Sequence, residues 1–143
     1  MFKFALMNYW LIKSEHFKYS WEQFEKDQQT FWDGVRNYQA RNNLREMKFG
    51  DLCLFYHSNE GKEVVGIAEV IKESYQDPTT TDQQWVVVEV RPHSKLKNTV
   101  TLSQMKSDER LSQMGLVKQP RLSVIKLTSQ EFETVLEMSN NAQ

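Results

Sequence analysis

One stretch of the chain, WDGVRNYQARN, combines aromatic rings with amide and guanidinium groups, a mixture that suits a heteroaromatic ligand. Trp32 and Tyr38 supply flat faces for stacking. Asn37 and Asn42 supply hydrogen-bond donors and acceptors, and Arg41 carries a charge that can meet a phosphate. Recognition of a base requires contact with both its face and its edge, so this composition indicates a base-binding segment. The alternative interpretation is a surface loop whose polar groups bond one another.

The sequence YHSN repeats this chemistry at the end of a predicted strand, residues 52–58. Tyr56 offers a ring there, and Ser58 and Asn59 offer hydroxyl and amide groups. Because ligand-binding residues gather where rigid elements end, this second stretch is a candidate part of the same pocket.

Lys13, Ser14 and Glu15 stand at the end of the first predicted strand, residues 8–13. Lys13 and Glu15 are two residues apart, so an extended chain projects them to the same side. One interpretation is ligand binding, and the other is a surface ion pair of little energetic worth. We expect no catalysis from the pair, because a carboxyl with good access to water lacks the shifted pKa that general acid–base work requires.

Other kinds of chemistry find little support in the residue pattern. The five glycines form no phosphate-binding loop, and the three histidines lie far apart, without further ligands at metal-binding spacing. Cys53 and His57 share a strand face, but four residues of extended chain separate them by roughly 13 Å, too far for a nucleophile and its base. We therefore expect no metal and no cofactor.

Composition indicates an ordinary globular domain. Hydrophobic residues make up 39% of the 143 residues, charged residues 26% and aromatic residues 12%. The formal net charge of −1 excludes a strong overall attraction to nucleic acid. Residues 95–126 hold seven Lys and Arg against two acids, which is compatible with a locally basic face or with a solvated surface. Cys53 is the single cysteine, and the apolar runs are too short to span a bilayer, so we expect a cytoplasmic protein without membrane contact.

The sequence predicts that these residues are positioned by strands joined by hairpins, with short helices at the corners. This pattern predicts an α+β fold built as a small mixed β-barrel with short peripheral helices. Strands are predicted at residues 8–13, 52–58, 63–72, 85–91 and 122–127, and helices at 20–27, 38–47, 101–106 and from 128 to about 138. Both faces of residues 52–58 are apolar, so we expect this strand at the centre of the sheet.

Five motifs carry a resemblance to a known family: YWLIKSE, WDGVRNYQARN, FYHSN, VVGIAEV and RLSV. The chain resembles the EVE domain, a family of the PUA-like superfamily that is similar in fold to the YTH readers of methylated adenine. The resemblance covers residues 7–138, which we expect to form one domain. Residues 1–6 are then an N-terminal extension, and residues 139–143 a flexible C-terminal tail.

The resemblance implies a PUA-like barrel whose pocket accepts a modified nucleobase, a 5-substituted cytosine in DNA. Trp32 and Tyr56 are then expected to stack on the base, with Trp21 as a wall. Edge contacts are expected from Asn37, Ser58, Asn59 and the Lys13-Ser14-Glu15 segment, phosphate contacts or loop bracing from Arg41 and Arg121, and further binding contacts from Tyr38 and Asn42.

Two positions depart from the pattern of the family: His16 stands where a proline is usual, and Pro120 where a serine is usual. Both flank expected pocket residues, so the rim of the pocket is affected more than the fold. Two alternative functions stay open, an RNA-binding PUA-like module and a hydrolase of modified nucleosides resembling ASCH domains, with Lys13 and Glu15 as base and partner. The sequence leaves the oligomeric state open.

Overall fold

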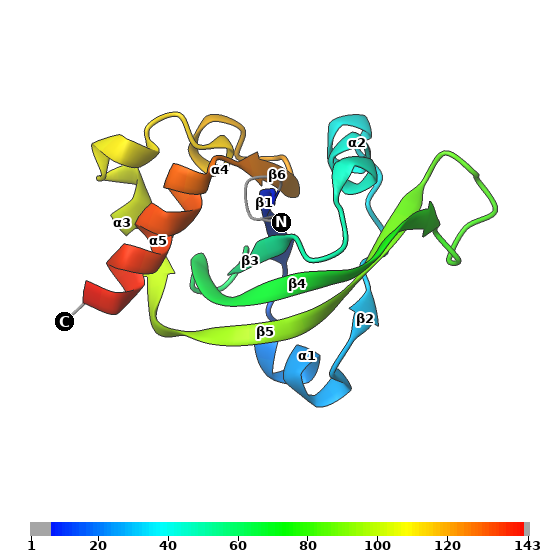
Figure 1. Ribbon diagram of the computed structural model, residues 1–143, viewed down its shortest axis with the longest axis horizontal. Helices are drawn as coiled ribbons and strands as arrows, with labels where there is room; N and C mark the ends of the chain where they lie inside the picture. The colour runs from blue at the N-terminus through cyan, green and yellow to red at the C-terminus, as the bar shows by residue number, and fades with distance from the viewer. Residues whose placement is uncertain (1–6, 142–143) are drawn as a thin grey trace, which may run out of the picture.

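A single mixed sheet of six strands organises the chain, in the order β2-β5-β4-β3-β1-β6 (Figure 1). The computed structural model describes residues 7–141. The strands are β1 (Tyr9–Ser14), β2 (Thr30–Phe31), β3 (Leu52–His57), β4 (Glu63–Gln76), β5 (Val86–Thr101) and β6 (Val124–Leu127). The helices are α1 (Trp21–Asp27), α2 (Tyr38–Glu46), α3 (Leu102–Lys106), α4 (Gly115–Lys118) and α5 (Ser129–Asn141), with a 3-10 turn at Glu109–Leu111.

The α+β class is confirmed, but the prediction of a closed barrel was wrong. Within residues 7–141 the sheet begins at β2 and ends at β6, and these edge strands do not pair. Closure needs two edge strands that continue the backbone ladder, and β2 has only two residues. At the other edge, α2 lies against β6, where the Asn43 amide donates to the Val124 carbonyl oxygen at 2.7 Å. The long strands β4 and β5 therefore curve across the molecule while the sheet stays open (Figure 1).

Strand β3 lies inside the sheet, as its two apolar faces predicted. It pairs in parallel with β1 and antiparallel with β4, and five of its six residues are buried. The parallel pairing requires a crossover, which α1, β2 and α2 supply. Because parallel strands end at the same edge, the carboxyl ends of β1 and β3 meet there. This edge holds the candidate site.

Helices α1, α2, α3 and α5 begin at or next to the predicted residues, whereas α4 was not predicted. Ser20 accepts a hydrogen bond from the Gln23 N–H to cap α1, and Asn37 accepts one from the Ala40 N–H to cap α2. Thr101 starts α3 with a complete capping box, and Thr128 starts α5 in the same way with Glu131. These local signals therefore fix where each short helix leaves a strand or loop.

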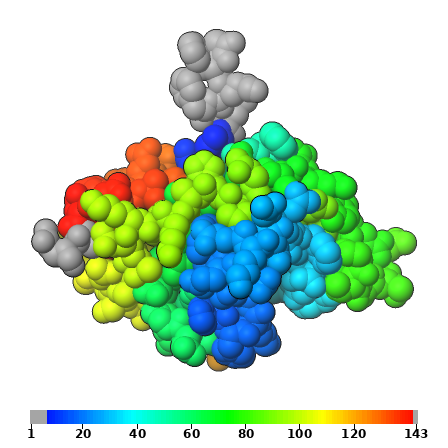
Figure 2. All heavy atoms as spheres, turned by 90° about the horizontal axis from the view of Figure 1, so that it is seen from below, coloured from blue at the N-terminus to red at the C-terminus, as the bar shows by residue number. Residues whose placement is uncertain are grey.

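An aromatic cluster forms the part of the core beneath α1. Trp21 and Phe24 of α1 pack against Phe55 of β3, with ring centroids between 5.2 and 5.5 Å apart. A Cβ atom at Gly66 would lie 2.5 Å from the Trp21 ring, so glycine is required for the indole to lie on β4. Figure 2 shows the segment around α1 covering much of one face, with the β4–β5 loop projecting beside it.

The C-terminal helix is longer than predicted. Helix α5 extends to Asn141, and Ser139 is buried, with its hydroxyl donating to the Asn98 carbonyl oxygen at 2.6 Å. The prediction that the helix ends near Met138 was therefore wrong. The predicted extension 1–6 and residues 142–143 lie outside the described residues. No helix within residues 7–141 combines the length and the apolar character needed to span a lipid bilayer.

Candidate functional site

A hollow of about 490 Å³ opens where β1 and β3 end side by side. Six of the predicted site residues line it: Lys13, Glu15, Tyr56, Ser58, Asn59 and Arg121. The remaining lining residues are Lys62, Leu102, Leu116, Pro120 and Ser123, and we call the whole the β1–β3 hollow. Its volume falls in the range of small-molecule sites, and its wall mixes apolar and polar groups as such sites do.

The hollow is basic although the chain as a whole is not. Lys13, Lys62 and Arg121 line it against one acid, Glu15. The Glu15 carboxylate is itself paired with the Lys18 ammonium at 3.2 Å, which offsets part of its charge. Three cations around one concave surface attract an anionic ligand.

Lys13 is fixed in the wall of the hollow. Its ammonium donates to the Pro120 carbonyl oxygen at 2.7 Å, and its backbone N–H donates to the Ser123 carbonyl oxygen at 3.0 Å. Burial lowers the pKa of Lys13 below its ordinary value. The unusual Pro120 thus serves as an acceptor for Lys13 through its carbonyl group, which proline shares with the serine usual at this position.

Tyr56 supplies an aromatic wall that is held by the sheet. Its side chain is buried, and burial raises the pKa of the phenol to about 12, so the group is a neutral donor at physiological pH. Next to it, the Ser58 N–H donates to the Ser14 carbonyl oxygen at 2.8 Å, and this bond ties the two strand ends together. Ser14 itself points inward, and its hydroxyl donates to the Tyr19 carbonyl oxygen. Ser14 therefore shapes the rim and does not line the hollow.

The two tryptophans expected in the pocket lie elsewhere. Trp32 is only 9% exposed, and its ring packs edge-on against Phe55 at 5.7 Å and Tyr19 at 6.2 Å between centroids. Trp21 is buried in the same aromatic cluster and touches a second, smaller hollow of about 300 Å³. Neither ring lines the β1–β3 hollow, so the structure does not bring the expected stacking pair of Trp32 and Tyr56 together there.

The residues expected on α2 form a separate surface. Tyr38 is 60% exposed and stacks on Trp85 at 5.3 Å, and the Arg41 guanidinium lies 5.0 Å from the Tyr38 ring centroid. Asn42 accepts hydrogen bonds from Arg41, and Asn37 is used as the helix cap. These four residues therefore lie outside the β1–β3 hollow, on or at the start of α2.

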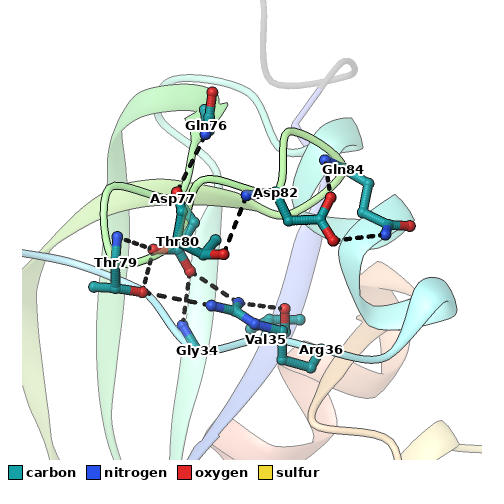
Figure 3. Close-up of polar contacts among 9 residues, drawn as sticks. All are labelled: Gly34, Val35, Arg36, Gln76, Asp77, Thr79, Thr80, Asp82 and Gln84. Carbon is teal, nitrogen blue, oxygen red and sulfur yellow. Dashed lines mark hydrogen bonds and ion pairs between the residues drawn. The ribbon is translucent and has the colours of Figure 1, made fainter.

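A buried carboxylate holds the WDGVRN loop against the β4–β5 loop (Figure 3). Asp77 accepts hydrogen bonds from the Arg36 guanidinium at 2.9 Å, from the Gly34 N–H at 3.1 Å and from Thr79. Burial alone would raise the pKa of Asp77, but the bonds from Thr79, Gly34 and Arg36 outweigh it and lower the pKa to about 2. Gly34 has φ +79°, a conformation that suits glycine. The Arg36 side chain and the Gly34 N–H thus have a structural role, in agreement with the alternative interpretation of this stretch as a bonded loop.

His16, the other departure from the family pattern, faces the second hollow. Its ring meets His57 edge-on at 4.8 Å between centroids, and its Nε2 lies 3.9 Å from the Glu22 carboxylate. His57 is buried, and its Nε2 accepts a hydrogen bond from the Trp21 N–H at 3.2 Å. Across residues 7–141, no group of three or more His, Cys, Asp and Glu side chains is arranged to hold a metal ion.

Apart from Pro120, the sequence did not indicate the residues that complete the hollow. Lys62 comes from the β3–β4 turn, and Leu102 and Leu116 come from α3 and α4. Basic residues within 95–126 were noted as a candidate basic face, and only Arg121 of these lines the hollow. Nothing in the local sequence predicts that Lys62 lines the hollow, because the folding of the β3–β4 hairpin brings it to that position.

The motifs at the two strand ends are the decisive features, and a comparison with protein families agrees with them. Residues 8–138 match the model of the EVE domain. The chain belongs to the EVE domain family. Thymocyte nuclear protein 1 of Gallus gallus is 37% identical over 164 residues, an alignment that covers 91% of this chain and 68% of the relative.

Solved structures give the same assignment. The protein Atu2648 from Agrobacterium tumefaciens is 46% identical, with a TM-score of 0.91 and coverage of 95% of both chains. Human THYN1, solved in complex with DNA that contains 5-methylcytosine, is 33% identical, with a TM-score of 0.89 and coverage of 95% of this chain and 99% of that one. A YTH domain from Zygosaccharomyces rouxii MRB1, bound to N6-methyladenosine RNA, is 17% identical with a TM-score of 0.58. That last likeness concerns the fold alone and confirms the expected relation to YTH domains.

Proposed function

We propose that this EVE domain is a reader of modified DNA that holds a 5-substituted cytosine at the β1–β3 hollow. The observation that carries the proposal is the human THYN1 complex with 5-methylcytosine DNA, a protein that shares this fold over nearly the whole chain. The hollow of this chain has the chemistry for such a ligand, with cations for phosphate, Tyr56 as an aromatic wall, and Ser58 and Asn59 as polar edge contacts.

The energetics favour a pocket of this mixed kind. Extruding a base from a duplex costs a few kcal/mol, and contact with an aromatic side chain returns about 1–3 kcal/mol. Hydrogen bonds to the base edge and charge-assisted contacts to the flanking phosphates must supply the rest. Lys13, Lys62 and Arg121 are suited to the phosphates, and Asn59 offers both a donor and an acceptor to the base.

The interpretation as a binding protein is also favoured over that as a hydrolase. Cys53 is buried, and burial raises the pKa of its thiol far above the ordinary value, which makes it a poor nucleophile. The carboxylate of Glu15 is paired with Lys18, while the Lys13 ammonium is occupied by the Pro120 carbonyl oxygen. Lys13 and Glu15 are thus each bonded to another group, whereas an acid–base pair would require them to contact each other.

Fluorescence anisotropy with short labelled oligonucleotides tests the proposal. Duplexes of one sequence carry a single cytosine, 5-methylcytosine or 5-hydroxymethylcytosine, and a matching RNA and a duplex with N6-methyladenine serve as competitors. We expect roughly tenfold tighter binding to a 5-substituted cytosine, equal to about 1.4 kcal/mol. Equal affinity for all duplexes would contradict recognition of the modified base. A preference for RNA would contradict a reader of DNA. Conversion of the modified nucleoside on prolonged incubation would favour the hydrolase instead.

A further inference from the structure

Phe17 is a solvent-exposed apolar side chain near the β1–β3 hollow. It is 65% exposed and lies in the turn between β1 and α1. Single exposed apolar residues are common, so exposure alone implies no function. The position is more informative: Glu15, two residues earlier, lines the β1–β3 hollow, and His16, the residue before Phe17, lines the second hollow. Phe17 therefore follows directly on residues that line the two hollows.

The turn that carries Phe17 is braced. The Lys18 and Tyr19 N–H groups both donate to the Glu15 carbonyl oxygen, at 2.9 and 2.8 Å. The Ser14 hydroxyl donates to the Tyr19 carbonyl oxygen, and the Lys18 ammonium pairs with the Glu15 carboxylate. These contacts hold the backbone on both sides of Phe17, so the ring is presented on a fixed turn.

A protein that extrudes a base from a duplex leaves a gap in the base stack. Proteins that bend DNA insert apolar side chains between base steps, and phenylalanine is among the residues used. The surroundings of Phe17 suit that approach, because the adjacent Lys18 is highly exposed and the nearby hollow carries Lys13 and Arg121. These cations lie toward the β1–β3 hollow, whereas Glu22, Glu60 and Glu63 line the second hollow, so the phosphates of a duplex are attracted on one side of the ring.

We propose that Phe17 inserts into the duplex and fills the place of the base that enters the β1–β3 hollow. This inference rests on the proposed function. It assigns Phe17 a positioning role, specific to double-stranded DNA: the ring stabilises the extruded state and makes no contact that a single-stranded ligand would need. Single-stranded DNA has no stack to open, so its binding is independent of Phe17.

The test compares Phe17→Ala with the wild-type protein on duplex and single-stranded DNA of one sequence, each with one 5-methylcytosine. Phe49→Ala is the matched control, because Phe49 is 70% exposed and precedes β3, at the end of that strand opposite to the hollow. A second readout is the fluorescence of 2-aminopurine placed next to the modified base, which rises when stacking is disrupted. Phe17→Trp keeps a large ring and should retain function.

We expect Phe17→Ala to lose roughly tenfold or more in duplex affinity and most of the fluorescence rise, with single-strand affinity and melting temperature unchanged. Phe49→Ala should match the wild-type protein in both assays. If Phe17→Ala keeps the duplex affinity, the fluorescence rise and the preference for the modified base, the insertion of Phe17 (the wedge) is overturned and the proposed function stands. Equal loss on both forms of DNA would also overturn the wedge. Wild-type protein that binds modified and unmodified duplexes equally would overturn the proposed function and the wedge together.

Discussion

Lys13 and Tyr56 are register partners on the parallel strands β1 and β3, and both side chains line the same hollow. A cation and an aromatic ring are thereby set next to each other by backbone pairing, which is more rigid than a loop. Rigid placement of binding groups lowers the entropy lost when a ligand is bound. The side chains around this pair have different roles, so their substitution should affect binding in different ways.

Loss of a phosphate contact should weaken binding without changing selectivity. We expect Lys13→Met and Arg121→Met each to reduce affinity for modified and unmodified duplexes by a similar factor, about tenfold. Lys97→Met is the control, because Lys97 is exposed on β5 and does not line the hollow. Anisotropy titrations measure the affinities. A change in the ratio between the two duplexes would show that the removed cation contacts the base.

Loss of an edge contact should have the opposite effect. Asn59 lines the hollow and offers both a donor and an acceptor. We expect Asn59→Ala to lower the preference for the modified duplex by about 1–3 kcal/mol, while affinity for the unmodified duplex changes little. Competition between the two duplexes measures this preference directly. Preserved selectivity would remove Asn59 from the set of base contacts.

Binding should depend on salt only moderately. Three cations line the hollow, so a plot of log affinity against log salt concentration should have a slope of about −2 to −3. Affinities measured at several potassium chloride concentrations give the slope, and Arg121→Met should reduce its magnitude by about one. A slope several times steeper would mean that a larger basic surface than the hollow contacts the DNA.

Truncation of Trp32 should destabilise the fold. Its ring is packed against Phe55 and Tyr19, and removal of a buried aromatic side chain costs about 3–5 kcal/mol. Urea unfolding should show a lower midpoint for Trp32→Ala than for the wild-type protein. A variant that unfolds like the wild-type protein but no longer binds DNA would instead restore the role of a stacking platform that the sequence indicated.

Stability should fall in mild acid through His57. Burial lowers the pKa of His57, the nearby His16 adds to this effect, and Glu22 and Glu63 oppose it. A lowered pKa means that the unfolded chain binds the proton more readily, so the stabilisation is present above about pH 6.5 and is lost as the pH falls below that value. Protonation also removes the acceptor used by the Trp21 N–H.

The free energy of unfolding in urea, measured between about pH 7.5 and 5.5, checks this expectation. His57→Gln should show a shallower dependence on pH than the wild-type protein. His93→Gln is the control, because His93 is an exposed histidine on β5. Parallel curves for the wild-type protein and His57→Gln would contradict the assignment.

Local patterns predicted much of the fold correctly. The two apolar faces of β3 gave its central position, and the helices predicted to start at residues 20, 101 and 128 begin one residue later, with Ser20, Thr101 and Thr128 as their caps. Strand β5 was underestimated, because Pro92 usually ends an interior strand. Here Pro92 pairs with Ala68 beside an irregularity in the register, and the strand continues to Thr101.

The candidate site was predictable in part. The motifs at the ends of β1 and β3 meet, as the family resemblance implied, but the parallel pairing that brings them to one edge was not predicted. Trp32 was expected to stack on the base because its neighbours in sequence are polar. Its burial is set by distant pairing, in which the Trp32 N–H donates to the Val88 carbonyl oxygen and the ring turns toward Phe55. Contacts between residues so far apart leave no local pattern.

The most direct test of the account is where the ligand binds. Two-dimensional amide NMR spectra, recorded during titration with a short duplex carrying 5-methylcytosine, report each backbone N–H separately. We expect the largest shifts to cluster at Tyr56, Ser58, Asn59 and Arg121, and the unmodified duplex to produce smaller ones. Shifts confined to α2 and the neighbouring Trp85, with the β1–β3 hollow unaffected, would contradict it.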